Sequence, residues 1–194
     1  MSKILDLIFV RDKHVCPWWL CFTFDNIFRK MIHDPYKILG SYIKAGDTVL
    51  DVGPGMGYFT IPMARMAGVE GRVIAADIQE KMLLALKKRA GQAGVDKSIT
   101  VHLSSRDFLG IKEQVNFILA FWMVHEVPDR KRFLNELFSV LKDNGTFLLA
   151  EPGIHVTKAN FEKTVNSAEQ AGFTISARPE IFLSRSVLFK KLPK

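Results

Sequence analysis

An alternation of short apolar segments with amphipathic segments constrains the fold of this chain more than any other feature. Hydrophobic periodicity predicts seven strands, at residues 48–52, 72–76, 99–103, 115–121, 146–150, 173–177 and 186–190. It also predicts helices at residues 36–43, 59–67, 79–93, 130–141 and 160–171. Strands that are joined through helices make right-handed crossovers and pair in parallel. The sequence therefore predicts an α/β fold with a doubly wound, mostly parallel, seven-stranded sheet and helices on both faces.

The composition fits one folded domain with a sizeable core. The chain has 194 residues, is 48% hydrophobic and contains 15 Phe, 3 Trp and 3 Tyr, which excludes an intrinsically disordered chain. Its 2 Cys exclude a disulfide-dense secreted scaffold. Residues 1–34 lie outside the alternation of strands and helices. We therefore expect a short N-terminal helical cap there and one main domain over residues 35–194.

The net charge of +7 is spread along the chain rather than gathered in one tail. Residues 1–40 carry 6 basic and 4 acidic side chains, residues 41–150 carry 14 and 12, and residues 151–194 carry 7 and 4. Nucleic acid, an anionic membrane and acidic small molecules all remain open as partners. The longest apolar stretch, residues 15–24, is too short for the ~20 residues of a bilayer span. With no export signal in the first residues, we expect a cytoplasmic protein without a transmembrane segment.

A glycine-rich turn is the most informative motif. Gly53, Gly55 and Gly57 follow the predicted strand at 48–52 and precede the predicted helix at 59–67. Glycines at alternate positions let a backbone pass close to a ligand where a Cβ would collide. The turn also delivers a helix N-terminus, whose unpaired N–H groups favour a negative ligand group. The motif predicts a ligand site between this strand and this helix.

An acid at the end of the next predicted strand supports a nucleoside ligand. Asp77 comes 24 residues after Gly53, where a carboxylate accepts hydrogen bonds from ribose hydroxyls. The alternative is a surface acid that caps the helix beginning near Gln79. Tyr58 stands where a dinucleotide fingerprint has its third glycine, and no Gly-Lys-Ser/Thr follows. These departures favour a ligand with a ribose and a small carboxylate over a polyphosphate.

With these residues in place, the chain resembles class I S-adenosylmethionine-dependent methyltransferases. Asp51-Val52-Gly53-Pro54-Gly55-Met56-Gly57 resembles their motif I, and Asp77 and Asp107 match their acids after the second and third strands. Segments 120–129 and 141–152 match their later motifs. Within the class, the chain is most similar to the small-molecule group that includes ubiquinone/menaquinone and arsenite methyltransferases. The resemblance implies a Rossmann-like fold, S-adenosylmethionine as cofactor and S-adenosylhomocysteine as product.

The resemblance also implies which residues bind the cofactor. Asp51 and the Gly53 carbonyl engage its ammonium group, and the turn at Gly55 and Gly57 accommodates its methionine portion. Asp77 binds the ribose hydroxyls. Ile78 and Phe108 enclose the adenine, with a buried core aromatic as the alternative for Phe108, and Asp107 accepts from the adenine amine. The predicted cofactor-binding residues are Asp51, Gly53, Pro54, Gly55, Gly57, Asp77, Ile78, Asp107, Phe108 and Phe121.

Methyl transfer to an acceptor that carries a proton needs a general base. His125 is the best candidate, because it follows the fourth predicted strand and histidine titrates near neutrality. Its alternative is a helix-capping or packing role. Glu126 and Glu151, which also lie at strand ends, have the same two interpretations.

The predicted cap contains an unusual aromatic segment at residues 14–24. It contains Trp18-Trp19 and Cys16 and Cys21, and four interpretations remain open: a lid over an apolar acceptor, a metal site with His14 and His33, a membrane or dimer patch, and ordinary core. The Cys-x4-Cys spacing is not a standard zinc pair, so no metal is predicted.

The sequence therefore predicts an S-adenosylmethionine-dependent methyltransferase with a small-molecule acceptor. One alternative is an RNA or protein methyltransferase, which the positive charge permits. The fourth strand, however, lacks the Asn/Asp-Pro-Pro-Tyr run of enzymes that methylate base amines. The other alternative is a protein that binds S-adenosylmethionine without catalysis, since a fold does not fix a function.

Overall fold

The computed structural model describes residues 32–193 and contains a seven-stranded sheet with the order β3-β2-β1-β4-β5-β7-β6. Its strands are β1 (Thr48–Val52), β2 (Arg72–Asp77), β3 (Ile99–Leu103), β4 (Val115–Phe121), β5 (Leu141–Pro152), β6 (Thr174–Ala177) and β7 (Ser184–Lys190). Strands β1 to β5 pair in parallel, whereas β7 runs antiparallel between β5 and β6. The predicted α/β fold with a mostly parallel sheet is confirmed.

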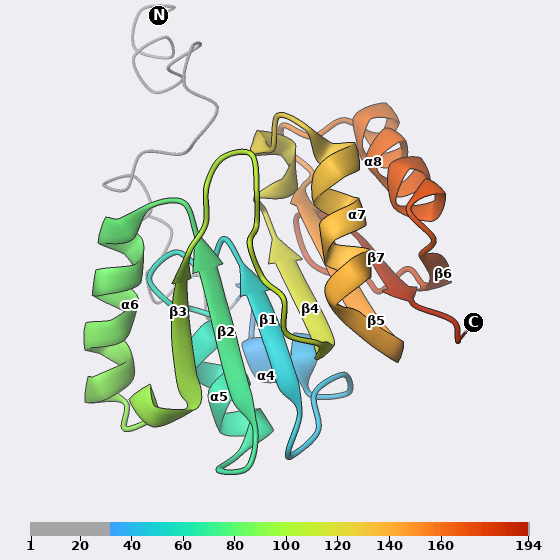
Figure 1. Cartoon of the computed structure of the whole chain (residues 1–194). Helices are drawn as coiled ribbons and strands as arrows, with labels where there is room; N and C mark the ends of the chain where they lie inside the picture. Colours follow the sequence, from blue (N-terminus) through green and yellow to red (C-terminus); the bar gives the residue numbers. More distant parts are fainter. Residues whose placement is uncertain (1–31, 194) are drawn as a thin grey trace, which may run out of the picture.

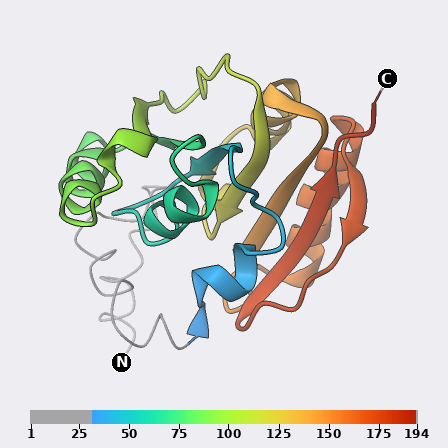
Figure 2. The same ribbon diagram turned by 90° about the horizontal axis from the view of Figure 1, so that it is seen from below.

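Helices cover both faces of this sheet (Figure 1). They are α4 (Pro35–Leu39), α5 (Thr60–Ala67), α6 (Glu80–Gln92), α7 (Arg130–Val140) and α8 (Lys158–Gln170). Buried residues of α4 and α5 share one core cluster, and buried residues of α7 and α8 share another. Seen from below in Figure 2, α4 and α7 lie on opposite sides of the sheet. Residues 1–31, which hold nearly all of the predicted cap and its aromatic segment, lie outside the described residues, so the predicted boundary at residue 34 stays a prediction.

The alternation of side chains in the central strands explains these two layers. In β4, Phe117, Leu119 and Phe121 join the α4 and α5 cluster, whereas Ile118 and Ala120 join the α7 and α8 cluster. Successive residues of a strand point to opposite faces, so a strand that is apolar at every position is buried on both sides. All five of these side chains are buried. The continuous apolar run of β4 is therefore what places it at the centre of a doubly covered sheet.

The helix starts follow from local capping residues. Asp34 accepts a hydrogen bond from the Tyr36 backbone N–H at 3.0 Å and Pro35 occupies the first turn, as predicted. Asp129 caps α7 by accepting from Arg132 N–H at 3.0 Å. The helix after Asp34 ends at Leu39 rather than at residue 43, so it is shorter than expected.

One strand is longer than predicted, and one connection between parallel strands lacks a helix. Strand β5 begins at Leu141 rather than at residue 146, because residues 143–145 continue the strand and exchange backbone hydrogen bonds with Lys191. Asn144 adopts a φ of 63° in this segment. Residues 104–114 connect β3 to β4 without a helix. Leu109 is buried in the α7 and α8 cluster, so this connection covers part of the sheet where a crossover helix would lie.

Candidate active site

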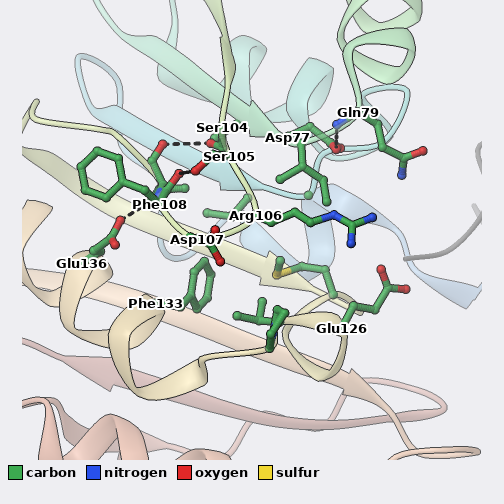
Figure 3. Close-up of a pocket in the computed structure, with 18 of the residues that line it drawn as sticks. Asp77, Gln79, Ser104, Ser105, Arg106, Asp107, Phe108, Glu126, Phe133 and Glu136 are labelled. Atoms are coloured by element: carbon green, nitrogen blue, oxygen red, sulfur yellow. Dashed lines mark hydrogen bonds between the residues drawn. The ribbon is translucent and has the colours of Figure 1, made fainter. Parts of the chain in front are cut away.

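A pocket lies at the carboxyl ends of the parallel strands, between the β3–β4 connection and α7 (Figure 3). Ligands of open α/β sheets bind at this edge, where the strand order reverses around the first strand. Within residues 32–193 the pocket is lined by Val52, Gly53, Gly55, Ala76, Asp77, Ile78, Gln79, Met82, Ser104, Ser105, Arg106, Asp107, Phe108, Leu109, Trp122, Met123, Glu126, Val127, Pro128, Asp129, Arg132, Phe133 and Glu136. Six of the ten predicted cofactor residues thus come together: Gly53, Gly55, Asp77, Ile78, Asp107 and Phe108.

The glycine turn forms the floor of this pocket. Gly53 has a φ of 67° and donates its N–H to the Ala76 carbonyl at 2.9 Å. A Cβ on Gly53 would lie 2.9 Å from the Met123 side chain, so the close packing of these two strand ends requires glycine. Gly55 has a φ of 54° and no heavy atom within 4 Å of an added Cβ. The turn therefore presents open backbone at Gly55 toward the pocket.

The other members of motif I support the turn from behind. Gly57 donates its N–H to the Pro54 carbonyl at 3.0 Å, and an added Cβ would lie 3.0 Å from the Leu86 side chain. Asp51 is buried and accepts a hydrogen bond from the Thr60 hydroxyl at 2.6 Å. None of Asp51, Pro54 and Gly57 is among the lining residues in the described part of the chain.

Asp77 presents a buried carboxylate at the wall of the pocket. Only 9% of the residue is exposed, so Asp77 is not a surface acid, but the contact with the start of α6 that this alternative expected is present. Its Oδ1 accepts the Gln79 backbone N–H at 2.8 Å, just before α6 begins. Burial raises the pKa of Asp77 above its ordinary value, although hydrogen bonds from the backbone N–H groups of Gln79, Gly55 and Ile78 lower it. A hydroxyl donor in the pocket would stabilise this carboxylate further.

Asp107 and Phe108 lie in the β3–β4 connection, opposite Asp77 in Figure 3. Both are exposed, and Phe108 keeps 49% of its surface accessible, so the alternative of a buried core aromatic is wrong. Ile78 is also 36% exposed at the pocket. Apolar side chains and a carboxylate that stay open to a pocket suit a planar, polar-edged base.

Phe121 is buried away from the pocket, and its neighbour Trp122 lines it instead. Phe121 packs against Phe59 with ring centroids 4.5 Å apart, because it shares the face of Leu119. A shift of one residue along a strand changes the face. Trp122 has a φ of 60°, uncommon for a bulky residue, and its indole N–H donates to Ser184 Oγ at 2.9 Å. Its rings also contact the buried His33. Trp122 rather than the predicted Phe121 therefore lines the pocket among the described residues, and a cofactor contact of Phe121 stays a prediction.

His125 is held by Glu151 beside the pocket rather than in its lining. The Glu151 carboxylate is buried and accepts the His125 backbone N–H at 3.2 Å and Nδ1 at 2.5 Å. Burial lowers the pKa of His125, but the hydrogen bond and charge of Glu151 raise it more, so the pKa lies above its ordinary value. Glu126 lines the pocket, with one carboxylate oxygen 3.9 Å from His125 Nε2. The three residues predicted at strand ends are therefore close together.

Comparison with known proteins identifies the family of this site. The family model of a methyltransferase domain matches residues 43–180, which include every pocket-lining residue. The chain belongs to this family. The prediction of a class I S-adenosylmethionine-dependent methyltransferase is thereby confirmed.

Relatives of this methyltransferase-domain chain include quinone methyltransferases. A ubiquinone/menaquinone biosynthesis C-methyltransferase from Marinomonas sp. is 28% identical over 117 residues, covering 60% of this chain and 47% of the relative. A demethylmenaquinone methyltransferase from Lactobacillus johnsonii is 36% identical over 105 residues, covering 53% and 43%. The chain thus spans about half the length of these curated relatives. The ubiquinone/menaquinone part of the predicted resemblance is confirmed, and the arsenite part stays a prediction.

Solved structures agree with the family. A SAM-dependent methyltransferase from Aquifex aeolicus has a TM-score of 0.79 at 25% identity, covering 90% of this chain and 98% of the other. Fibrillarin from Aeropyrum pernix, solved with natively bound S-adenosylmethionine, has a TM-score of 0.60 at 17% identity, covering 75% and 67%, which shows the fold alone. The family and the Aquifex aeolicus structure support S-adenosylmethionine as the cofactor.

The residues present fit that cofactor. Gly55 leaves open backbone where a Cβ would enter the pocket, and Asp77 offers a buried carboxylate to donors. Ile78 and Phe108 offer apolar surface, and Asp107 offers an acceptor at the far end. These groups match a methionine portion, a ribose and an adenine in that order.

Proposed function

We propose that this protein is an S-adenosylmethionine-dependent methyltransferase that methylates a small-molecule acceptor. The observation that carries the proposal is the pocket that joins the motif I turn, Asp77 and Asp107 at one sheet edge in a chain of this family. The small-molecule acceptor is supported by the quinone methyltransferases among the relatives. No helix among residues 32–193 has the length and apolarity to cross a membrane. The cytoplasm remains our sequence-based expectation for its location.

Different residues of the pocket bind different portions of the cofactor. S-adenosylmethionine, when bound, supplies a methyl group on a positively charged sulfur, which is an activated leaving group. Asp77 accepts from the ribose hydroxyls and Asp107 from the adenine amine, while the backbone at Gly55 makes room for the methionine portion. Pre-organised binding of this kind accelerates a displacement by holding the two reactants at reacting distance.

His125 is the residue that we propose as general base. Because the Glu151 carboxylate can only accept, His125 Nδ1 carries the proton of their hydrogen bond, and Nε2 of the neutral ring is an acceptor. Glu151 also accepts the His125 backbone N–H, so one buried carboxylate fixes both the position and the tautomer of the ring. Nε2 then takes the proton that an acceptor O–H, N–H or acidic C–H group releases as it is methylated.

Two measurements on the full chain test this function. Titration calorimetry should show binding of S-adenosylhomocysteine, and labelled S-adenosylmethionine should transfer its methyl group to a component of small-molecule cell extract fractions. Absence of binding at millimolar ligand would refute the proposal. Binding without transfer to any fraction would instead leave the non-catalytic alternative as the better description.

His125→Asn separates catalysis from binding. The Asn amide can still donate to Glu151, so the buried carboxylate keeps a partner. We expect methyl transfer to fall by roughly 10²-fold or more, the contribution of a positioned base, while affinity for S-adenosylhomocysteine stays unchanged. Unchanged transfer would remove His125 from the mechanism.

A further inference from the structure

The segment that lines the pocket opposite Asp77, residues 105–108, is a tight loop rather than a helix. Ser105 N–H donates to the Phe108 carbonyl at 3.1 Å, which closes a short loop with Arg106 and Asp107 at its tip. The Leu109 carbonyl accepts from Ser104 Oγ at 2.9 Å and from His102 Nε2 at 2.9 Å. These bonds tie the base of the loop to the end of β3.

Glu136 ties the same loop to α7 on the other side of the pocket. Its Oε2 accepts the Leu109 backbone N–H at 2.7 Å. A dashed line at Glu136 marks a hydrogen bond in Figure 3. Its Oε1 accepts from Arg132 Nε at 3.3 Å, one turn earlier on α7. A charge-assisted bond to a backbone N–H is stronger and shorter than a neutral one. One oxygen of Glu136 thus holds the loop, while Arg132 on the same helix engages the other oxygen and orients the carboxylate.

Arg132 adds a second contact between α7 and the loop. Its guanidinium carbon lies 5.8 Å from the centroid of the Phe108 ring, within the range of a cation–π contact. Phe108 is therefore held from α7 through Arg132, and the next residue, Leu109, is held through Glu136. Asp107 precedes both anchored residues, so the position of its carboxylate depends on them.

We propose that Glu136 is a positioning residue that sets the base selectivity of the nucleoside pocket. This inference rests on the proposed function, since it concerns the adenine of the cofactor. By fixing the Leu109 N–H, Glu136 holds Asp107 where it accepts from an exocyclic amine. A base with a carbonyl oxygen in place of that amine brings an acceptor against the carboxylate and is rejected. Without the anchor, the loop tip moves and the discrimination is lost.

The test compares two ligands that differ at this position and in the protonation of the adjoining ring nitrogen N1. S-adenosylhomocysteine carries the amine, and S-inosylhomocysteine carries an oxygen there. Calorimetry on the wild-type chain should show S-adenosylhomocysteine binding at least roughly tenfold tighter, the effect of one good hydrogen bond. In Glu136→Ala the ratio of the two affinities should fall to about two, mainly through weaker binding of S-adenosylhomocysteine. Glu136→Gln keeps a carbonyl oxygen for Leu109 N–H and should restore most of the ratio.

Glu162→Ala is the matched control. Glu162 forms a comparable ion pair with Arg178, at 2.9 and 3.0 Å, on the neighbouring helix α8 and outside the lining of the described pocket. Its removal should leave the ratio of the two affinities unchanged. This control separates the loss of an anchored loop from the general loss of a surface ion pair.

Each outcome decides between the two proposals. A wild-type chain that binds neither ligand overturns the proposed function itself. A wild-type chain that discriminates, with an unchanged ratio in Glu136→Ala, overturns the role of Glu136 alone. Equal weakening of both ligands also overturns it, because that marks a merely structural role. If Glu136→Ala does not fold, Arg132→Met removes the partner that orients Glu136, and an unchanged ratio in that variant overturns the inference.

Discussion

At the scale of single residues, Asp77 combines a destabilising burial with a proposed binding role. Burial raises its pKa above the ordinary 3.8, although backbone hydrogen bonds oppose this shift. A raised carboxyl pKa means that the folded chain holds the proton more tightly than the unfolded chain. The ionised carboxylate therefore lowers the free energy of unfolding as the pH rises through the folded pKa. The proposed ribose role at neutral pH requires the ionised carboxylate, which is the form that burial destabilises in the ligand-free protein.

Asp77→Asn should therefore raise the free energy of unfolding of the ligand-free protein and weaken the binding of S-adenosylhomocysteine. Because Asn stays neutral, the free energy of unfolding of the variant relative to wild type should rise between pH 3.5 and pH 7. Affinity for S-adenosylhomocysteine should fall by about 1–3 kcal/mol, the loss of charge-assisted bonds. Urea denaturation at both pH values and calorimetry measure the two effects. Asp143→Asn, an exposed acid outside the pocket lining, is the control. Unchanged affinity would exclude the ribose role of Asp77.

The pKa of His125 depends on the charged residues around it. Burial lowers its pKa; Glu151 and then Glu126 raise it, and the positive charge of Arg130 lowers it. The pKa of His155, whose ring centroid lies 5.6 Å from that of His125, is lowered by its own burial and by the charge of His125. The net shift at His125 is upward, so its ion pair with Glu151 stabilises the fold at low pH, and this stability is lost as the pH rises through the folded pKa.

Glu151→Gln should lower the pKa of His125 below its wild-type value, because the largest raising contribution is removed while burial remains. NMR titration of the two rings measures this directly. In the wild-type chain His125 should titrate at higher pH than His155, and the gap should narrow in the variant. A wild-type His125 that titrates below His155 would contradict the Glu151 contact.

At the scale of helices, strands and loops, the local sequence predicted the bounds of several strands, but it did not predict which distant residues contact the loops. The bounds of β1, β3 and β4 agree with the predicted ranges, because continuous apolar runs end sharply at turn residues. Asp107 was found through its place after the third strand, whereas Glu136 was not. Glu136 lies on α7, 27 residues away from Leu109 in the sequence. Its i,i+4 spacing from Arg132 is typical of an ordinary ion pair on a helix surface. A contact between distant segments leaves no local signal.

The directions of the side chains that follow the end of β4 could not be predicted from the sequence either. Phe121 follows the alternation of β4, whereas Trp122 leaves it through a positive φ that nothing in the composition indicates. His125 follows β4 as expected, and the short turn Val124–Glu126 brings its side chain to Glu151 at the end of β5. Such turns depend on tertiary hydrogen bonds, here to Ala150 and Glu151.

The motif I turn gives a prediction at this scale. Gly55→Ala places a methyl group into open space at the pocket and forces alanine into a φ of 54°, which costs about 1–2 kcal/mol of folding stability. Calorimetry should show weaker binding of S-adenosylhomocysteine. Gly91→Ala is the matched control, because Gly91 lies within α6 with open space around it, and alanine there should stabilise the chain by about 0.5–1 kcal/mol. Equal binding by both variants would contradict the role of the turn.

At the scale of the whole molecule, the pocket depends on both layers of the fold. One wall comes from the turn between β1 and α5, and the other comes from α7 and the β3–β4 connection. The sheet holds these walls in register through the parallel pairing of β1 with β2 and β4. Binding of ligand to the folded chain alone raises its stability, by about 2.7 kcal/mol at a concentration of 100 times Kd.

The charge of the molecule bears on the alternative acceptor, RNA. The excess of +7 is divided among all parts of the chain, and Arg72, Arg132 and Arg178 pair with carboxylates at separate places in the fold. RNA affinity rises with the number of phosphates that a cationic surface neutralises, and it falls steeply with salt. We therefore expect a fluorescein-labelled RNA to bind no tighter than about 1 μM at 150 mM salt.

Fluorescence anisotropy between 50 and 200 mM salt checks this expectation, with S-adenosylhomocysteine present to fill the pocket. A dispersed charge should give a shallow dependence of RNA affinity on salt, because few counterions are released together. Cofactor affinity, measured in parallel, should change little, since it depends on hydrogen bonds and apolar contacts inside the pocket. Nanomolar RNA binding with a steep salt dependence would instead mean that the basic side chains act as one surface, and RNA would then replace a small molecule as the proposed acceptor.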